Sequence, residues 1–249
     1  MLTKAHWIHF PSIDSTNDYL LQQDFEHGTI ITADSQQRGK GRKERKWKDV
    51  PKKSFLFSLG LYIDDFERYS YFSLVVALCV VESLYAMMKQ LSLSEKTFYI
   101  KWPNDVLMRD ESQNLGKLAG ILIETQFKNK KTWKVVVGIG LNWSATPSID
   151  EPALFPPVAL FSENVEYEPL FYLDFLIQKM NELSLEKPYS FESYKDLIHR
   201  YHFLMHRKIR INTEEYVVEN IDNKGYLRIR NKENQITTIK DWDDRIVLV

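Results

Sequence analysis

The sequence of 249 residues predicts an α+β protein, with a mixed body followed by a small C-terminal β module. Strand-like runs recur through the body, and helix-like segments separate them. In the run 133–143, Val135, Val137 and Ile139 alternate with other residues, which is the period-two pattern of a sheet covered on one face. From about residue 208 the chain changes to short strands and polar turns. We therefore expect two domains, residues 1–205 and 206–249.

The same patterns place the individual elements. The predicted strands of the body are 29–35, 54–63, 98–102, 119–127 and 133–143. Helices are expected at 14–23, 71–91, 169–183 and 191–204. The segment 71–91 is apolar nearly all round, which predicts a helix buried in the core. In the C-terminal module, DNKG at 222–225 predicts a hairpin turn.

Composition excludes several classes of protein. The 33 basic and 34 acidic residues give a net charge of −1, so there is no general attraction for polyanions. Cys79 is the only cysteine, which excludes an intrachain disulfide, fits a reducing compartment and predicts a buried core position. The N-terminus lacks the apolar stretch of a signal peptide, and the apolar runs are expected to be too short to span a bilayer. These features predict a cytoplasmic protein with no membrane partner.

Positive charge is concentrated in SQQRGKGRKERKW at 35–47, where six basic residues surround two glycines. Such a cluster is compatible with a nucleic-acid-binding patch, with a solvated loop that has no function, and with a flexible loop that closes over a phosphate. The cluster alone does not distinguish between these three interpretations.

Four further motifs lie at predicted element ends: DSTND (14–18), KWPND (101–105), GKLAGILIE (116–124) and GIGLN (138–142). Taken singly, the first is typical of a helix cap, the second of a strand-to-turn junction, and the third of a lysine that reaches solvent from a strand edge. GIGLN lacks the third glycine and the following helix of a dinucleotide-binding motif, so we exclude that function.

Three histidines, His199, His202 and His206, are spaced so that they would share one face of the last predicted helix. A metal site could use this spacing, but no HExxH motif or acidic partner accompanies it. Packing of this face toward the β module is the favoured interpretation, and no metal ligands are assigned.

In order and spacing, STN, QQxGxGRxxRxW, KWPND, GKLAGIL and GIGLN resemble the catalytic domain of the biotin protein ligases, also called biotin–[acetyl-CoA-carboxylase] ligases. The resemblance covers Ser15 to Trp143 and extends more loosely through the C-terminal module. It implies a mixed, largely antiparallel sheet related to class II aminoacyl-tRNA synthetases, flanked by helices and followed by a small SH3-like barrel. Because the motifs begin at residue 15, we expect the monofunctional type without an N-terminal DNA-binding domain, and no DNA partner.

The resemblance implies a two-step activity, that of biotin–[biotin carboxyl-carrier protein] ligase. The carboxylate of biotin attacks the α-phosphorus of ATP, with Mg²⁺ neutralising the triphosphate, and biotinyl-5′-AMP forms. A lysine of a biotin carrier domain of a biotin-dependent carboxylase then accepts the biotinyl group. The implied partners are this carrier, biotin and ATP, and a homodimer is left open.

Roles for single residues also follow from the resemblance. Catalysis is assigned to Lys117 and Arg42. Biotin binding is assigned to Ser15, Thr16, Asn17, Gln36, Lys40, Gly41, Arg42, Lys117 and Gly120. Nucleotide binding is assigned to Gly39, Lys40, Arg42, Trp47, Asn104, Lys117 and Asn142. Asp105 is expected only to brace the turn, and the GIGLN glycines to leave space near the nucleotide.

Two residues depart from the family pattern, since Lys40 replaces the first arginine of GRGR and Glu44 replaces a glycine. Lysine keeps the charge but loses the planar, bidentate geometry of arginine. We expect the 38–46 loop to be mobile without ligand. The two replacements are expected to affect the stability of this loop and not the type of reaction.

Three alternative functions remain. The first is a lipoate or octanoate protein ligase or transferase of the same fold, and the second is a nucleic-acid-binding module that uses the 35–47 cluster. The third is a biotin-binding regulator that has lost ligase activity through the loop changes.

Overall fold

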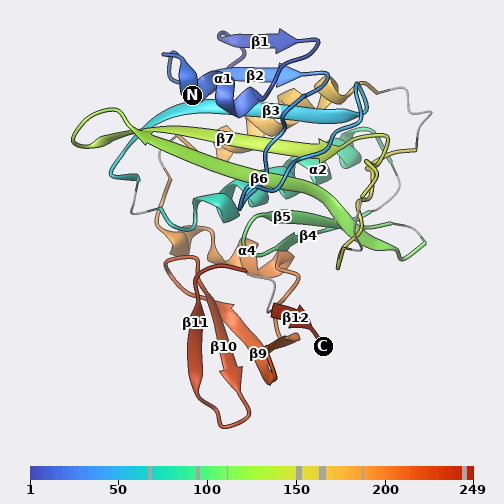
Figure 1. Cartoon of the computed structure of the whole chain (residues 1–249), viewed down its shortest axis with the longest axis vertical. Coiled ribbons are helices and arrows are strands. Elements are labelled where there is room, and N and C mark those ends of the chain that lie inside the picture. The colour runs from blue at the N-terminus through green and yellow to red at the C-terminus, as the bar shows by residue number, and fades with distance from the viewer. Residues whose placement is uncertain are drawn as a thin grey trace.

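A seven-stranded sheet forms the body, with the strand order β1-β2-β3-β7-β6-β5-β4 (Figure 1). The computed structural model describes the chain except residues 67–68, 94–95, 111, 150–152, 163–166, 187 and 243–245. The strands are β1 (Trp7–Phe10), β2 (Thr29–Ala33), β3 (Ser54–Asp64), β4 (Thr97–Lys101), β5 (Asp105–Arg109), β6 (Leu115–Phe127) and β7 (Thr132–Asn142). Only the β1–β2 pair is parallel among these neighbours, so the predicted mixed, largely antiparallel sheet is confirmed.

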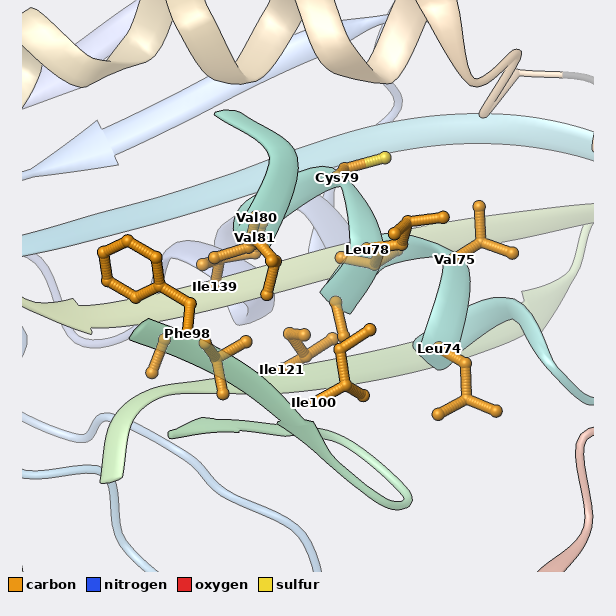
Figure 2. Close-up of a cluster of buried hydrophobic side chains, with 14 of the residues drawn as sticks. Leu74, Val75, Leu78, Cys79, Val80, Val81, Phe98, Ile100, Ile121 and Ile139 are labelled. Atoms are coloured by element: carbon orange, nitrogen blue, oxygen red, sulfur yellow. The ribbon is translucent and has the colours of Figure 1, made fainter. Parts of the chain in front are cut away.

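One face of the sheet is covered by α2 (Phe72–Gln90), which is the apolar helix that the sequence predicts. In Figure 2 its side chains gather with Ile100, Ile121 and Ile139 of the sheet. Cys79 is fully buried among them, as predicted, and burial raises the pKa of its thiol. By length and composition α2 could cross a membrane, contrary to our expectation of short apolar runs, but 72% of its apolar window is buried inside the protein.

The opposite face carries a smaller apolar cluster under α1 (Thr16–Gln22), formed by Leu20, Ile31 and Val136. Val136 faces this cluster, whereas Val135 and Val137 on either side of it belong to the main core. The alternation in β7 therefore separates the two faces, as the sequence predicts. On this face α1 packs over β3 and β7.

Four shorter helical elements follow the sheet: η2 (Pro169–Tyr172), α3 (Leu173–Glu182), η3 (Phe191–Ser193) and α4 (Lys195–Tyr201). The prediction of a helix at 191–204 is wrong in its extent, because α4 ends at Tyr201 and His202 is already extended. The three histidines consequently do not share a helix face. His199 Nε2 instead accepts from the backbone N–H of Ile221 in the C-terminal sheet at 3.5 Å.

A five-stranded antiparallel sheet ends the chain, with the order β11-β10-β9-β8-β12 (Figure 1). Its strands are β8 (Lys208–Ile211), β9 (Glu214–Ile221), β10 (Leu227–Asn231), β11 (Ile236–Ile239) and β12 (Ile246–Leu248). The predicted hairpin turn at 222–225 is confirmed, since the N–H of Gly225 donates to the carbonyl of Asp222 at 2.9 Å. The domain boundary at 205/206 stays a prediction.

His202 lies where the body meets this module. It forms a parallel bridge with Ile100 of β4, and both of its ring nitrogens are buried without a partner among the described residues. Burial, and then the nearby His199 and Lys101, lower the pKa of His202 to about 3. The ring is therefore neutral in the folded protein at physiological pH.

We expect this histidine to destabilise the protein in acid. Because its folded pKa of about 3 lies below the ordinary value of 6.5, the unfolded chain binds the proton between these pH values and the folded chain does not. The free energy of unfolding should fall as pH is lowered through this window, by up to about 1.4 kcal/mol per pH unit. Urea unfolding between pH 6.5 and 4.5 measures this dependence. In His202→Leu the slope of the unfolding free energy against pH should be smaller than in the wild type by the contribution of about one proton. Replacement of the exposed His6 by alanine is the control. An unchanged slope in His202→Leu would show that the folded protein already binds this proton.

Candidate active site

One cleft gathers most of the residues assigned from the sequence. It lies where the start of α1, the 36–47 loop, the turn before β5 and strands β3, β6 and β7 meet, and its volume is about 490 Å³ with the part open to solvent included. The assigned residues that line it are Ser15, Thr16, Asn17, Gln36, Lys40, Gly41, Arg42, Trp47, Asn104, Lys117 and Gly120. Phe57, Ile121, Leu122, Gly138, Ile139 and Gly140 complete the lining. Gly39 and Asn142 border neighbouring clefts instead.

The start of α1 presents polar groups to this cleft. Ser15 is the N-cap, and its hydroxyl accepts from the backbone N–H of Asp18 at 3.3 Å. The N–H and hydroxyl of Thr16 both donate to Oε1 of Gln36, at 2.8 and 3.0 Å. DSTND is thus a helix cap, and the cap also fixes the orientation of Gln36.

Asn17 is held by hydrogen bonds on both sides of its amide. Its Nδ2 donates to Glu124 at 2.8 Å, and the Ser58 hydroxyl lies 2.6 Å from its Oδ1. A methyl group at Gly138 would lie 2.4 Å from that Oδ1, so glycine is required for Asn17 to occupy this position. The first glycine of GIGLN therefore makes room for a polar side chain of the cleft.

The second GIGLN glycine, Gly140, lies under the indole of Trp47. A methyl group there would lie 2.3 Å from the ring, and one at Gly120 would lie 2.9 Å from it. The indole also lies beside Lys117, whose Nζ is 5.7 Å from the ring centroid. Trp47 Nε1 is buried without a hydrogen-bond partner among the described residues. The two GIGLN glycines therefore make room for side chains of the protein: Gly138 for Asn17 and Gly140 for Trp47. The expectation that they leave open space near the nucleotide is not met.

The basic loop forms a tight hairpin. The N–H of Gly41 donates to the carbonyl of Arg45 at 2.7 Å. At the tip, Lys43 and Glu44 have φ values of 54° and 60°, a pair of left-handed residues of the kind that a type I′ turn requires. Glycine adopts this conformation without strain and glutamate does not. The replacement of glycine by Glu44 therefore falls at a strained position of the turn.

Acidic and amide groups on the body and the module hold the cations of this loop. Lys40 pairs with Asp18 of α1, and this hydrogen bond raises the pKa of Lys40. Arg42 donates to Oδ1 of Asn104 at 3.0 Å and pairs with Asp241 of the C-terminal module. Burial acts to raise the pKa of Asp241, but hydrogen bonds from the loop outweigh it and lower the pKa.

Two lysines share one buried carboxylate beside the loop. Lys117 Nζ lies 2.8 Å from Oδ1 of Asp105, and Lys101 Nζ lies 3.6 Å from Oδ2. Burial acts to raise the pKa of Asp105, but Lys117 and then Lys101 outweigh it and hold the pKa below its ordinary value. Burial lowers the pKa of Lys101. Asp105 thus does more than brace a turn, because it is the counterion of the predicted catalytic lysine.

A β-bulge places Lys117 in the cleft. Leu107 pairs with Lys117 while its neighbour Val106 pairs with Ala119, so β6 carries an extra residue at this point. The bulge interrupts the alternation of side chains. Lys117 and Gly120 therefore line the same cleft although regular alternation would place them on opposite faces.

A second cleft, of about 1070 Å³ with its open part included, adjoins the first at Trp47 and Lys117. Phe155 contributes to its apolar wall. Asn142 borders it and donates through Nδ2 to the carbonyl oxygens of Lys117 and Val158, at 3.3 and 3.2 Å. Its Oδ1 is buried without a partner in the part of the chain that the structure describes. Lys117 thus stands between a small polar cleft and a larger, partly apolar one.

Sequence reasoning missed the acidic partners of the site. Asp18 and Asp105 lie inside motifs that were recognised, DSTND and KWPND, but no pattern assigned them to a cation. Asp241 lies in the C-terminal module, 199 residues from Arg42, and no sequence signal connects the two.

The sequence is similar to a known family of ligases and to several of its members. The model of the biotin/lipoate A/B protein ligase family matches residues 9–142. The bifunctional ligase/repressor BirA of Escherichia coli is 34% identical over 141 residues, which cover 53% of this chain and 39% of that protein. The biotin–[acetyl-CoA-carboxylase] ligase of Paracoccus denitrificans is 32% identical over 171 residues, 66% of each chain. The chain therefore spans about two fifths of the bifunctional relative.

Solved structures show the same fold along nearly the whole chain. The biotin protein ligase of Aquifex aeolicus in complex with biotin and ATP has a TM-score of 0.73 and 24% identity, with 98% of this chain and 99% of that chain covered. The Leishmania major enzyme in complex with biotinyl-5-AMP has a TM-score of 0.59 and 17% identity, with 94% and 98% covered. Since the family model covers more than half of the sequence, the chain belongs to the biotin/lipoate A/B protein ligase family.

Proposed function

We propose that the protein is an ATP-dependent biotin–protein ligase, which makes biotinyl-5′-AMP and transfers the biotinyl group to a lysine of a biotin carrier domain. The observation that carries the proposal is the position of Lys117, between two adjoining clefts and paired with a buried carboxylate. An acid-activating ligase needs a fixed cation at this place, because a carboxylate must approach a phosphate of the same charge.

In the first step a carboxylate oxygen of biotin attacks the α-phosphorus of ATP, an O–P bond forms, and pyrophosphate leaves. An ammonium group at ~4 Å from each anion is worth roughly 4 kcal/mol at an effective dielectric constant near 20. Lys117 supplies this charge, and Asp105 keeps the ammonium directed into the cleft. In the second step the carrier amine attacks the acyl carbon, AMP leaves with the bonding electrons, and the amine loses its proton.

The polar end of the first cleft suits the ureido ring of biotin. A cyclic urea presents two N–H donors and one carbonyl acceptor, so its site needs both kinds of group. Ser15, Thr16, Asn17 and Gln36 supply them, and Gly120 lines the same cleft.

The loop and the second cleft suit the nucleotide. Among the described residues Arg42 donates to Asn104 and Asp241 through two of its five N–H groups, and we expect the others to serve phosphate oxygens. The adenosine would lie along the wall that carries Trp47 and Asn142. Gly39, Lys40 and Gly41 would cover the phosphates from the loop side.

Mg²⁺ would reach this site on the triphosphate. Among the described residues no group of three or more histidine, cysteine, aspartate or glutamate side chains is placed to hold a metal ion. Three carboxylates beside the cleft, Asp18, Asp105 and Asp241, are already paired with lysine or arginine. Magnesium commonly binds through substrate phosphates and keeps several waters, which fits this arrangement.

Two alternatives are less well supported. Lipoate and octanoate have no ureido group, so they cannot exchange hydrogen bonds with the polar end of the cleft as a cyclic urea can. A nucleic-acid patch would present its cations on an open surface, whereas Lys40 and Arg42 line the cleft. A carrier protein and a cytoplasmic location are part of the proposal.

The test is incubation of the protein with biotin, ATP and Mg²⁺ and a biotin carrier domain, followed by mass spectrometry of the carrier. We expect a mass increase of one biotinyl group that requires ATP, and no product with lipoate or octanoate. Lipoyl transfer at a comparable rate would contradict the biotin assignment, and retention of DNA on a filter at low salt without any transfer would favour the nucleic-acid alternative.

A further inference from the structure

The C-terminal module contacts the basic loop through two consecutive residues, Asp241 and Trp242. Asp241 pairs through one oxygen with Arg42 and through the other with Lys43, whose Nζ lies 3.2 Å away. Lys43 also donates to the backbone carbonyl of Trp242 at 2.6 Å. One carboxylate and one carbonyl of the module thus hold two adjacent cations at the tip of the loop.

The same pair of residues reaches the lysine cluster. Lys101 Nζ lies 4.6 Å from the ring centroid of Trp242, and Lys101 shares Asp105 with Lys117. The module therefore contacts both parts of the proposed adenylation site, the loop and the buried carboxylate with its two lysines.

The loop needs this external support. Its tip residues Lys43 and Glu44 are both left-handed, which disfavours the turn for residues other than glycine, asparagine and aspartate. The side chains of Arg42 and Lys43 are 34% and 47% exposed, so packing holds them weakly. Asp241 offsets the strain by pairing with two adjacent cations, which reduces the repulsion between them.

We propose that Asp241 is a positioning residue that holds the 38–46 loop closed and Arg42 aimed at the cleft before the nucleotide binds. The C-terminal module then sets the fraction of molecules whose loop is ready to bind. The apparent dissociation constant of a ligand is its intrinsic value divided by this fraction. The effect on nucleotide affinity rests on the proposed ligase function, whereas the effect on the loop does not.

Two consequences of the Asp241 charge oppose each other. Its negative charge repels the phosphates, which alone would weaken nucleotide binding. Its hold on Arg42 prepares the loop, which strengthens binding. Within the described part of the chain Arg42 uses two of its five N–H groups, on Asn104 and Asp241, so the carboxylate can stay in place when a phosphate arrives at the others. We therefore expect preparation of the loop to be the larger effect.

Limited trypsin digestion of the free protein tests the hold on the loop, since cleavage after lysine or arginine falls within 38–48. Asp241→Asn should accelerate cleavage there by about 3- to 10-fold, the range expected for one or two ion pairs at the surface, and Asp241→Glu should restore part of the protection. Glu219→Gln removes a carboxylate that pairs with Arg230 inside the same module and is the matched control. Unchanged loop cleavage in Asp241→Asn, or first cleavage inside the module, would overturn the proposal.

ATP–pyrophosphate exchange tests the second consequence. Asp241→Asn should raise KM for ATP by about 3- to 10-fold and change kcat by less than about twofold, because loop preparation affects binding and not the bond-forming step. A lower KM would show that Asp241 competes with phosphate for Arg42 and would overturn the proposal. If the wild-type protein shows no exchange, the proposed function fails, and the digestion experiment still decides whether Asp241 holds the loop.

Discussion

Lys117→Ala should lower the rate of biotinyl-5′-AMP formation by roughly 10²- to 10³-fold, the loss typical when one charge-stabilising donor is removed from a transition state. In the proposed reaction the Lys117 ammonium faces both the attacking carboxylate and the α-phosphate. Charge on the phosphate oxygens and on the leaving pyrophosphate develops most in the transition state, so the loss should fall mainly on kcat. ATP–pyrophosphate exchange with saturating biotin measures it directly.

Two further variants separate this role from a structural one. Lys117→Arg keeps the positive charge but replaces the compact ammonium group by a planar guanidinium group. Its rate of adenylation should therefore lie between those of Lys117→Ala and the wild type. Lys195→Ala removes an exposed lysine of α4 that pairs with Glu192, and it should leave the exchange rate unchanged. The fold should persist in Lys117→Ala, because Lys101 still neutralises Asp105. Less than a tenfold loss of rate in a folded Lys117→Ala protein would remove Lys117 from the mechanism.

Local patterns predicted five of the seven strands of the body, and the resemblance to the biotin protein ligases predicted which motifs contribute to the cleft. The alternation in β7 defined its two faces, and the motifs around Ser15, Gln36 and Lys117 do line one cleft.

What the sequence could not predict depends on long-range pairing. β1 is a short strand whose parallel partner is β2, and nothing in its four residues indicates that pairing. The bulge opposite Leu107 arises from strand register, which a single strand does not reveal. The acids that hold Arg42 and Lys117 were missed for the same reason, since an ion pair between distant segments leaves no local pattern.

Asp105→Asn should be the most destabilising single change near the site. The Asp105 side chain is 16% exposed and pairs with both Lys101, which is 9% exposed, and Lys117. Removing its charge leaves two ammonium groups close together in a poorly hydrated place, and breaking a buried pair in this way typically costs about 3–5 kcal/mol. Urea unfolding at pH 7 should show a loss near the lower end of that range, because Lys117 is partly exposed.

A second substitution distinguishes a charge effect from a packing effect. In Asp105→Asn/Lys101→Met, one of the two unneutralised lysines becomes apolar, so the double variant should be more stable than Asp105→Asn by about 1–2 kcal/mol. Adenylation should stay low in both variants, since Lys117 has lost the carboxylate that directs it into the cleft. If the double variant is no more stable than Asp105→Asn, the two lysines do not share the Asp105 charge. If instead stability and adenylation recover together, Asp105 acts only by holding the fold, and the direction of the Lys117 ammonium must come from its strand and the bulge alone.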